Sequence, residues 1–229
     1  MILPTPNAAT IGGVAILFLG FPGAVMKRLL FCLLCMSVVG CGESEQGGQK
    51  SSSENQQDAI AALEKLGARI LYKDDKVLFV GLGGAQITDA DLVHLKRVDN
   101  YFPFLQLDLS GTKTTDAGLV HLKDIKEVSE LLLDGTQVTN EGLLHLQGLP
   151  KLSSLGLTNT SITDAGVEHL QQMTNLGSVF LGGTKITDTG IVHMKKLKNL
   201  NLLLLHGAQI SDAAVADLQK ALPDCEIHR

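Results

Sequence analysis

The fold is decided by the stretch LDLSGTKTTDAGLVHL, residues 107–122, because similar strings recur along the chain at a fixed spacing. LLLDGTQVTNEGLLHL begins at Leu131, LGLTNTSITDAGVEHL at Leu155 and VFLGGTKITDTGIVHM at Val179, so each copy begins 24 residues after the last. A further copy begins at Leu203, and an earlier one at Val80 is separated by three extra residues. A fixed period of this length predicts a stack of structural repeats, here six units closed by a partial strand at 225–228.

Each repeat contains two kinds of hydrophobic spacing. The LxL part alternates, which predicts a short strand with one buried face. The TDxGLxHL part has helical spacing, with Leu119 and Leu122 three residues apart. No unit can bury its own apolar face, so the stacking of neighbouring units must supply the core. The inward columns predicted in this way are Leu107/Leu131/Leu155/Val179/Leu203 and Leu109/Leu133/Leu157/Leu181/Leu205.

The whole unit reads LxLxxTxITDxGLxHLxxLxxL, and this pattern resembles the leucine-rich repeat in its 24-residue bacterial form. The resemblance covers residues 80–229 and implies an α/β solenoid, with short parallel strands on a concave face and short helices on a convex face. Members of this family mostly bind other macromolecules through the concave sheet. A binding function is therefore what the resemblance implies.

Three polar or glycine columns accompany the apolar ones. Gly and Asn share a position after each strand, which predicts a left-handed turn residue. A Thr column after it predicts buried hydroxyls bonded to the backbone of the adjacent turn. A second Gly column inside the helix predicts close approach of adjacent helices, since Gly there otherwise costs about 1 kcal/mol. The columns are Gly111/Gly135/Asn159/Gly183/Gly207, Thr112/Thr136/Thr160/Thr184 and Gly118/Gly142/Gly166/Gly190.

The N-terminal region, residues 1–40, is expected to be a leader. Lys27 and Arg28 follow Met26 and precede an uncharged run to Val39, which is typical of a secretory signal of residues 26–40. The run ends VVGC, which resembles the bacterial lipoprotein cleavage box and implies that the thiol of Cys41 carries a lipid. A plain signal peptide or an uncleaved anchor is the alternative. For residues 1–25, a translation start at Met26 is favoured over a first membrane segment.

The leader is followed by a linker and a cap. Residues 41–57 contain the lipidated cysteine and then GESEQGGQKSSSENQQ, which has no apolar side chain and predicts a flexible tether. Residues 58–79 predict an N-terminal cap made of a helix over 58–66 and a hairpin with strands at 69–72 and 77–80. The repeats then occupy residues 80–229.

The charge balance of the chain argues against nucleic acid as a partner. The net charge is −5, and removal of Lys27 and Arg28 with the leader makes it −7. An acidic chain without a basic footprint is expected to repel phosphate backbones and anionic lipid surfaces. The four cysteines do not form a spread of pairs, so no disulfide framework is expected.

No catalytic or metal site is predicted. The Asp column supplies one carboxylate per turn, too few for calcium, and fits helix N-termini better. The His column places imidazoles about 10 Å apart, too far to share zinc, so packing against the neighbouring helix and a backbone hydrogen bond are expected. No motif of a hydrolase, metalloprotease or nucleotide-binding loop is present. The protein is therefore expected to be no enzyme and to need no cofactor. The columns are Asp89/Asp116/Asp164/Asp188/Asp212 and His94/His121/His145/His169/His193.

Function is expected at the outward strand positions, which vary between repeats while the packing positions do not. Apolar side chains rimmed by polar ones there are typical of a partner-binding patch. The predicted partner-binding residues are Asp108, Leu132, Asp134, Phe180, Leu202, Leu204 and His206.

These features predict a monomeric module that is lipid-anchored in the bacterial cell envelope and binds a protein or glycan. The alternative is an intracellular adaptor similar to F-box leucine-rich-repeat proteins. Residues 43–66 are too short and too polar to hold an F-box.

Overall fold

The structure is a computed structural model that describes residues 10–11, 14–15, 50–73, 76–98 and 104–229. The chain divides into two units, residues 1–47 and 48–229. In the first unit, β1 (Thr10–Ile11) and β2 (Val14–Ala15) form a short antiparallel pair. The predicted signal peptide, the lipidation site Cys41 and the first part of the tether lie outside the described residues.

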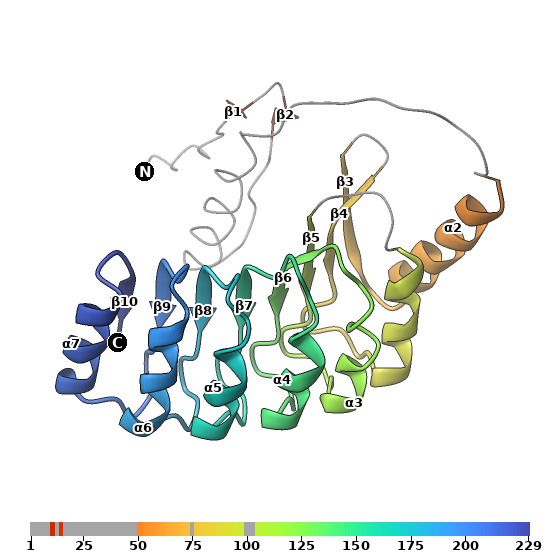
Figure 1. Ribbon diagram of the computed structural model, residues 1–229. Helices are drawn as coiled ribbons and strands as arrows, with labels where there is room; N and C mark the ends of the chain where they lie inside the picture. The colour runs from red at the N-terminus through yellow and green to blue at the C-terminus, as the bar shows by residue number, and fades with distance from the viewer. Residues whose placement is uncertain (1–9, 12–13, 16–49, 74–75, 99–103) are drawn as a thin grey trace, which may run out of the picture. The chain divides into compact units, whose positions relative to one another are not determined.

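The second unit is built on one eight-stranded sheet in the order β10-β9-β8-β7-β6-β5-β4-β3 (Figure 1). Strands β4 to β10 are parallel, and β3 pairs antiparallel with β4. This is the stack of repeats that the sequence predicts, with the closing strand included. The bounds are β3 Arg69–Lys73, β4 Lys76–Gly81, β5 Leu105–Asp108, β6 Val128–Leu132, β7 Ser154–Gly156, β8 Ser178–Phe180, β9 Leu202–Leu204 and β10 Glu226–His228.

One short helix per repeat lies on the other side of the core, so that sheet and helices form two layers (Figure 1). Among the described residues, no helix has both the length and the apolar character needed to span a bilayer. The helices of the repeats are η2 Asp89–Arg97, α3 Asp116–Leu119, α4 Asn140–Leu146, α5 Asp164–Leu170, α6 Asp188–Ile191 with η3 Val192–Lys196, and α7 Asp212–Ala221.

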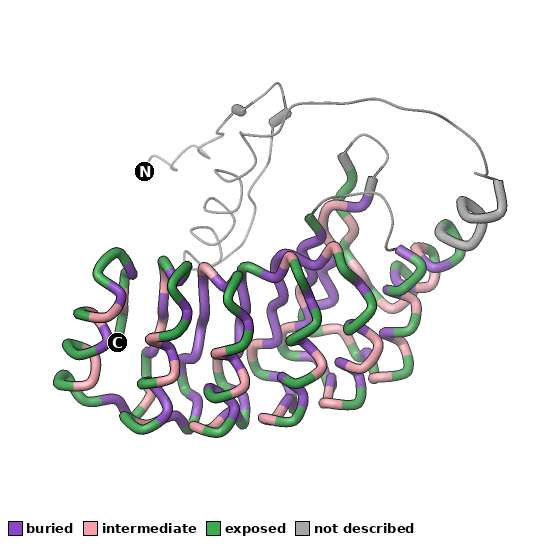
Figure 2. Tube along the Cα trace, viewed as in Figure 1, coloured by how far each residue is buried: buried purple, intermediate pink, exposed green. Residues whose placement is uncertain are grey.

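The core lies between the two layers and consists of the predicted apolar columns. The strand register places Leu131 beside Leu155, Leu155 beside Val179 and Val179 beside Leu203, all fully buried. Burial of one such side chain contributes about 1.5–3 kcal/mol, and each unit repeats the contribution. Buried segments accordingly recur in strand after strand (Figure 2).

The turn after each strand has the geometry that the sequence predicts. Asn159 has φ of 56°, and Gly135, in the preceding unit, has φ of 69°. The hydroxyl of Thr136 donates to the carbonyl of Leu133 at 2.7 Å, and Thr160 bonds Leu157 in the same way at 2.6 Å. Each buried Thr therefore closes the turn of its own unit.

A column of carboxylates joins neighbouring repeats. Asp116 accepts two hydrogen bonds from the next unit: the backbone N–H of Thr139 donates to Oδ1 at 2.8 Å and the Thr139 hydroxyl to Oδ2 at 2.6 Å. Asp164 binds Thr187 in the same way, at 2.7 Å for both bonds. Each Thr is the N-cap of its helix, so the predicted helix-start role is correct and the Asp adds a bond between units. The remaining pairs are Asp89–Thr115, Asn140–Thr163 and Asp188–Ser211.

The same carboxylates explain the glycine column inside the helices. A Cβ at Gly142 would lie 2.3 Å from Oδ1 of Asp116, and one at Gly190 would lie 2.3 Å from Oδ1 of Asp164. The close approach is therefore between each glycine and the carboxylate of the preceding unit. In the first unit Asp91 occupies the position of this glycine, and it accepts hydrogen bonds from its own Thr88 at 2.7 and 2.8 Å.

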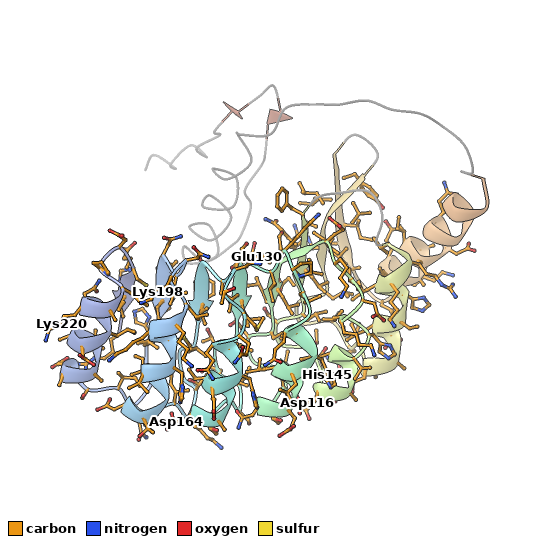
Figure 3. The ribbon with its side chains drawn as sticks, viewed as in Figure 1. Asp116, Glu130, His145, Asp164, Lys198 and Lys220 are labelled. Carbon is orange, nitrogen blue, oxygen red and sulfur yellow. The ribbon has the colours of Figure 1, made fainter. Side chains whose placement is uncertain are left out.

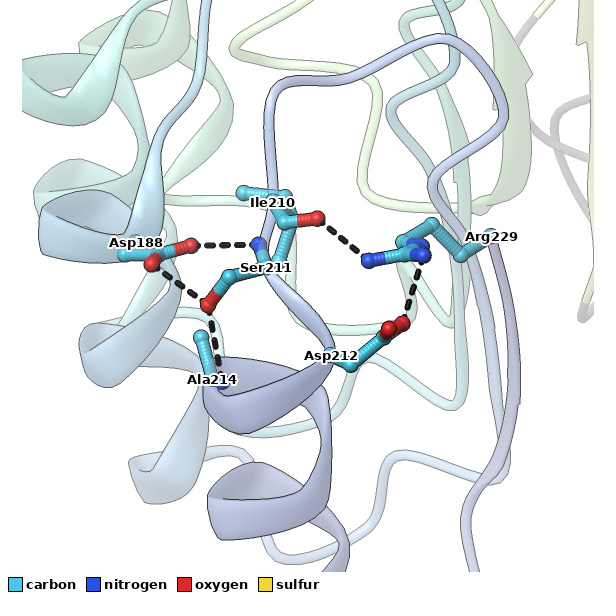
Figure 4. A network of polar contacts seen from close by, with 6 residues as sticks. All are labelled: Asp188, Ile210, Ser211, Asp212, Ala214 and Arg229. Atoms are coloured by element: carbon cyan, nitrogen blue, oxygen red, sulfur yellow. Dashed lines mark hydrogen bonds and ion pairs between the residues drawn. The ribbon is translucent and has the colours of Figure 1, made fainter.

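The last repeat uses a modified form of this arrangement (Figure 4). Ser211 replaces Thr and binds Asp188 through its N–H and hydroxyl, at 2.7 and 2.6 Å. Asp212 pairs with Arg229 at 2.5 Å, and Arg229 also donates to the carbonyl of Ile210 at 2.7 Å. Asp212 is thus bonded to an arginine, where Asp116 and Asp164 are bonded to the Thr of the following unit.

The predicted cap is present, with one correction. Helix α2 (Lys50–Lys65) precedes the hairpin of β3 and β4, so residues 50–57 are helical and the prediction of a flexible tether there is wrong. Lys, Glu and Gln, which occur in this segment, have good helix propensity. The helix is held by Ala59 and Leu63, which are fully buried in the core.

Candidate functional site

The outward strand positions form rows across the sheet, on the face opposite the core. The register pairs Asp108 with Leu132, Leu132 with Gly156, Gly156 with Phe180, and Phe180 with Leu204. Leu132 and Phe180 are absent from the hydrophobic core cluster, although the residues on either side of each along the chain belong to it. The strands therefore bring the predicted residues onto one face, as the alternation of side chains requires.

Burial on this face differs from the expectation of an exposed apolar patch. Phe180 is 2% exposed and Leu132 is 9% exposed, so neither presents an accessible surface. Leu132 leans over its neighbour, because its Cδ2 lies 3.0 Å from the position of a Cβ on Gly156. Phe180 lies outside the core cluster, so its burial arises on the outward face. Leu202 and Leu204 are half-buried, and they are the accessible apolar part of the row.

Carboxylates dominate the polar part of this face. Asp108 accepts a hydrogen bond from the N–H of Ser110 at 2.9 Å, and Asp134 accepts one from the N–H of Thr158 in the next unit at 2.7 Å. Glu130, beside Ser154 in the register, is buried, and Glu226 beside Leu202 is exposed. The described outward positions of β5 to β10 carry these carboxylates and neither Lys nor Arg. Their side of the sheet is therefore acidic as well as apolar.

Histidines gather at the C-terminal end of the row. The rings of His206 and His228 are stacked, with centroids 6.4 Å apart and planes 10° from parallel. Nε2 of His228 lies 2.7 Å from Oε1 of Glu226. The sequence prediction included His206 but missed Glu226 and His228. Both could have been found, because they lie one 24-residue period after Leu202 and Leu204. The accessible end of the face thus combines leucine, imidazole and carboxylate side chains.

The Asp and His columns on the helices do not form a site. The Asp column is engaged in the bonds between repeats, and hydrogen bonds from the side chain and then the backbone of Ser211 lower the pKa of Asp188. The His column is half-buried, and no hydrogen bond of its rings is found among the described residues, so the expected bonds to backbone carbonyls are not seen. Within the same part of the chain, no group of three His, Cys, Asp or Glu side chains could hold a metal ion.

Cys225 is a buried thiol next to the last strand. Burial first, and the nearby charge of Glu226 second, raise its pKa to about 11. The nucleophilic form of a cysteine is the thiolate, which this environment disfavours at neutral pH. Cys225 therefore behaves as a small apolar side chain.

The fold is similar to that of a known structure. An internalin (InlF) from Listeria monocytogenes is similar with a TM-score of 0.51 and 22% identity, over 66% of this chain and 39% of the internalin. A leucine-rich-repeat protein from Leptospira interrogans gives a TM-score of 0.49 and 23% identity, over 66% of this chain and 37% of that one. This chain thus spans well under half of the length of either protein. No protein-family model matches the chain, and no curated protein matches it in sequence.

The repeat pattern, the parallel sheet with one helix per unit, and the likeness to InlF agree with one another. The chain folds as an α/β leucine-rich-repeat solenoid.

Proposed function

We propose that this protein is a membrane-anchored leucine-rich-repeat module of the bacterial cell envelope that binds a protein or glycan partner through its concave face, without catalysis. The observation that carries the proposal is the contrast between the two faces of each strand. Inward positions repeat the same aliphatic residues, whereas outward positions hold different residues that the register brings into continuous rows. A surface that varies while its scaffold repeats is what recognition of a specific partner requires.

The residues of the face indicate the chemistry of that partner. Asp108, Asp134 and Glu226 supply negative charge, and Leu202 and Leu204 supply accessible apolar surface. A complementary surface would carry lysine or arginine side chains beside apolar ones. A protein segment of that composition fits better than an uncharged glycan. We therefore place the contact at the C-terminal half of the face, where the apolar side chains are accessible.

The proposed lipid anchor is supported by the sequence alone. Cys41 lies outside the described residues. The VVGC box and the uncharged run before it motivate lipidation of Cys41. Metabolic labelling with a fatty-acid probe tests this part, with Cys41→Ser as the comparison. Equal labelling of the two chains would refute it.

The binding proposal is tested with two substitutions of aliphatic residues, the half-buried Leu204 and the exposed Val192. Leu204→Asp adds a charge to the concave face, and Val192→Asp adds the same charge to the convex face at η3. Affinity capture from envelope extract should lose the partner with Leu204→Asp and retain it with Val192→Asp, at unchanged far-UV circular dichroism. Phe180→Asp is unsuitable, because Phe180 is buried and a charge there would unfold the protein as well. Retention of the partner by both variants would refute the concave site.

A further inference from the structure

The two long edges of the solenoid carry opposite charge. Because β4 to β10 are parallel, the turns that precede the strands lie along one edge and the turns that follow them along the other. We call the first, together with the C-terminal ends of the helices that lead into it, the lysine edge, defined by Lys96, Arg97, Lys123, Lys126, Lys151, Lys195, Lys196, Lys198 and Lys220. The opposite edge carries the aspartates that begin the helices. In Figure 3, Lys198 is close to the first edge, and Asp116 and Asp164 lie along the second.

Part of the lysine edge is neutralised and part is not. Lys96 pairs with Asp124 at 3.0 Å, Lys151 pairs with Glu127 at 2.5 Å, and Lys195 pairs with Asp217. Arg97, Lys123, Lys196 and Lys220 are exposed, and no ion pair of theirs is found among the described residues. These side chains leave positive charge in solvent at both ends of the edge.

Exposed apolar side chains lie on the same edge, at its N-terminal end. Leu71 is 55% exposed, Tyr72 is 49% exposed and Phe104 is 38% exposed. Tyr72 pairs with Val77 near the start of β4, and Phe104 immediately precedes β5. Tyr72 and Phe104 therefore lie where β3 ends and β4 and β5 begin, and Leu71, which pairs with Phe79, lies next to Tyr72 in β3. Among the described residues, the other large exposed apolar side chains, Val93, Leu144 and Val192, belong to the helices.

We infer that the lysine edge, together with Leu71, Tyr72 and Phe104, rests on an anionic lipid bilayer. Tyr and aliphatic side chains partition into the interface between water and lipid, and Lys side chains beside them are attracted to anionic headgroups. The net charge of the chain does not prevent this contact. The helices that separate the two edges are about 10 Å long, which exceeds the Debye length of about 8 Å at physiological salt, so the acidic edge is screened from the bilayer.

A second copy of the chain is the competing occupant, since its acidic edge would complement the lysines. The observations favour the bilayer, because the acidic edge offers no large exposed apolar side chain to cover Leu71, Tyr72 and Phe104 among the described residues. The inference is separate from lipidation of Cys41. It concerns which edge touches the lipid once the chain is on a membrane.

The absence of Trp from the sequence provides a direct test. The full chain with Tyr72→Trp is reconstituted into vesicles of phosphatidylcholine with about one-third phosphatidylglycerol, and quenching by brominated phosphatidylcholine is measured. Ala165→Trp, an exposed position at the start of α5 on the acidic edge, is the control. Quenching is expected in the Tyr72→Trp chain alone, and it should weaken in about 0.5 M salt because the Debye length falls to roughly 4 Å. Equal quenching of the two variants, or none in the Tyr72→Trp chain, would overturn the inference.

Matched charge reversals test the contribution of the lysines. In the Tyr72→Trp chain, Lys123→Glu with Lys196→Glu changes the lysine edge, and Lys113→Glu with Lys185→Glu makes the same change on the acidic edge. The first pair should reduce the membrane-contact equilibrium by roughly 25-fold or more, since each lost lysine alone accounts for about five-fold, and the second pair should leave it unchanged. Equal effects of the two pairs would contradict the inference. Self-association of the chain without lipid would also contradict the inference if the first pair of substitutions abolished it. That result would assign the lysine edge to contact with a second copy of the chain.

Discussion

Substitution of Gly142 by Ala tests the bonds between repeats. Ala is the better helix former by about 1 kcal/mol, so an unobstructed site in α4 would gain stability. In this structure the new Cβ would lie 2.3 Å from Oδ1 of Asp116, and it would also lie 3.0 Å from side-chain carbons of Leu119 and Val138. The Asp116 side chain must therefore move, and it leaves both of its bonds to Thr139.

The magnitude follows from the bonds that are lost. Each hydrogen bond to a charged group contributes about 1.5–3 kcal/mol, and partial exposure places these two at or below the lower end. Two such bonds, offset by the gain in helix propensity, leave a net destabilisation of about 2 kcal/mol. This corresponds to a decrease in Tm of roughly 4–8 °C for a domain of this size. Gly148→Ala, in the turn after α4, is the control for an unobstructed glycine, because its Cβ would meet only Nζ of Lys126, at 3.9 Å.

The assay is a double-mutant cycle by urea and thermal unfolding. Asp116→Ala removes the obstructing carboxylate and costs about 1–3 kcal/mol, because the N–H of Thr139 loses its partner. Gly142→Ala in that background should be neutral or stabilising, so the two substitutions should couple by about 2 kcal/mol. The reasoning is refuted if the two effects add, or if Gly142→Ala melts like Gly148→Ala.

Three further predictions concern the turns, the acid response and the thiol. Gly135→Val should cost about 1–2 kcal/mol or more in thermal melts, because φ there is 69°, whereas Asn159→Gly should be near neutral. The folded-state pKa of Asp188 is lowered, so its contribution to stability is present above the unfolded pKa of about 4 and is lost as pH falls below it. The difference in Tm between wild type and Ser211→Ala should therefore narrow from about pH 6 to about pH 2, and a constant difference would contradict the Ser211 bond. Cys225, with a pKa of about 11, should react with iodoacetamide slowly when folded and quickly in urea; equal rates would place the thiol at the surface.

The repeat pattern alone was enough to predict most of the fold. Leu131, Leu155 and Val179 recur at a fixed spacing, and an aliphatic residue at a fixed spacing can only be buried by stacking its unit on the next. The left-handed turn at Asn159 was predictable because few residues accept φ above zero. Both features follow from residue types that recur at a fixed spacing, so comparing the repeats with one another was enough to predict them.

Features that depend on contacts between units could not be read in the same way. The sequence shows that Gly142 and Asp116 each recur, but it does not show that the carboxylate of one unit occupies the Cβ position of the next. The burial of Phe180 was missed for a similar reason, since alternation gives the face of a side chain and not what covers it. The net charge of the chain did not indicate the lysine edge. A net charge adds together lysines and aspartates, and the parallel strands place these on opposite edges.

The concave contact can be tested most directly by site-specific photocrosslinking in the intact envelope. A photoreactive amino acid is placed at Leu204 or His206 on the concave face, and at Val192 or Leu144 on the convex helices. The proposed function predicts a crosslinked partner band from the two concave positions and none from the two convex positions. Crosslinks from the convex positions alone would contradict it and would move the binding surface to the helices.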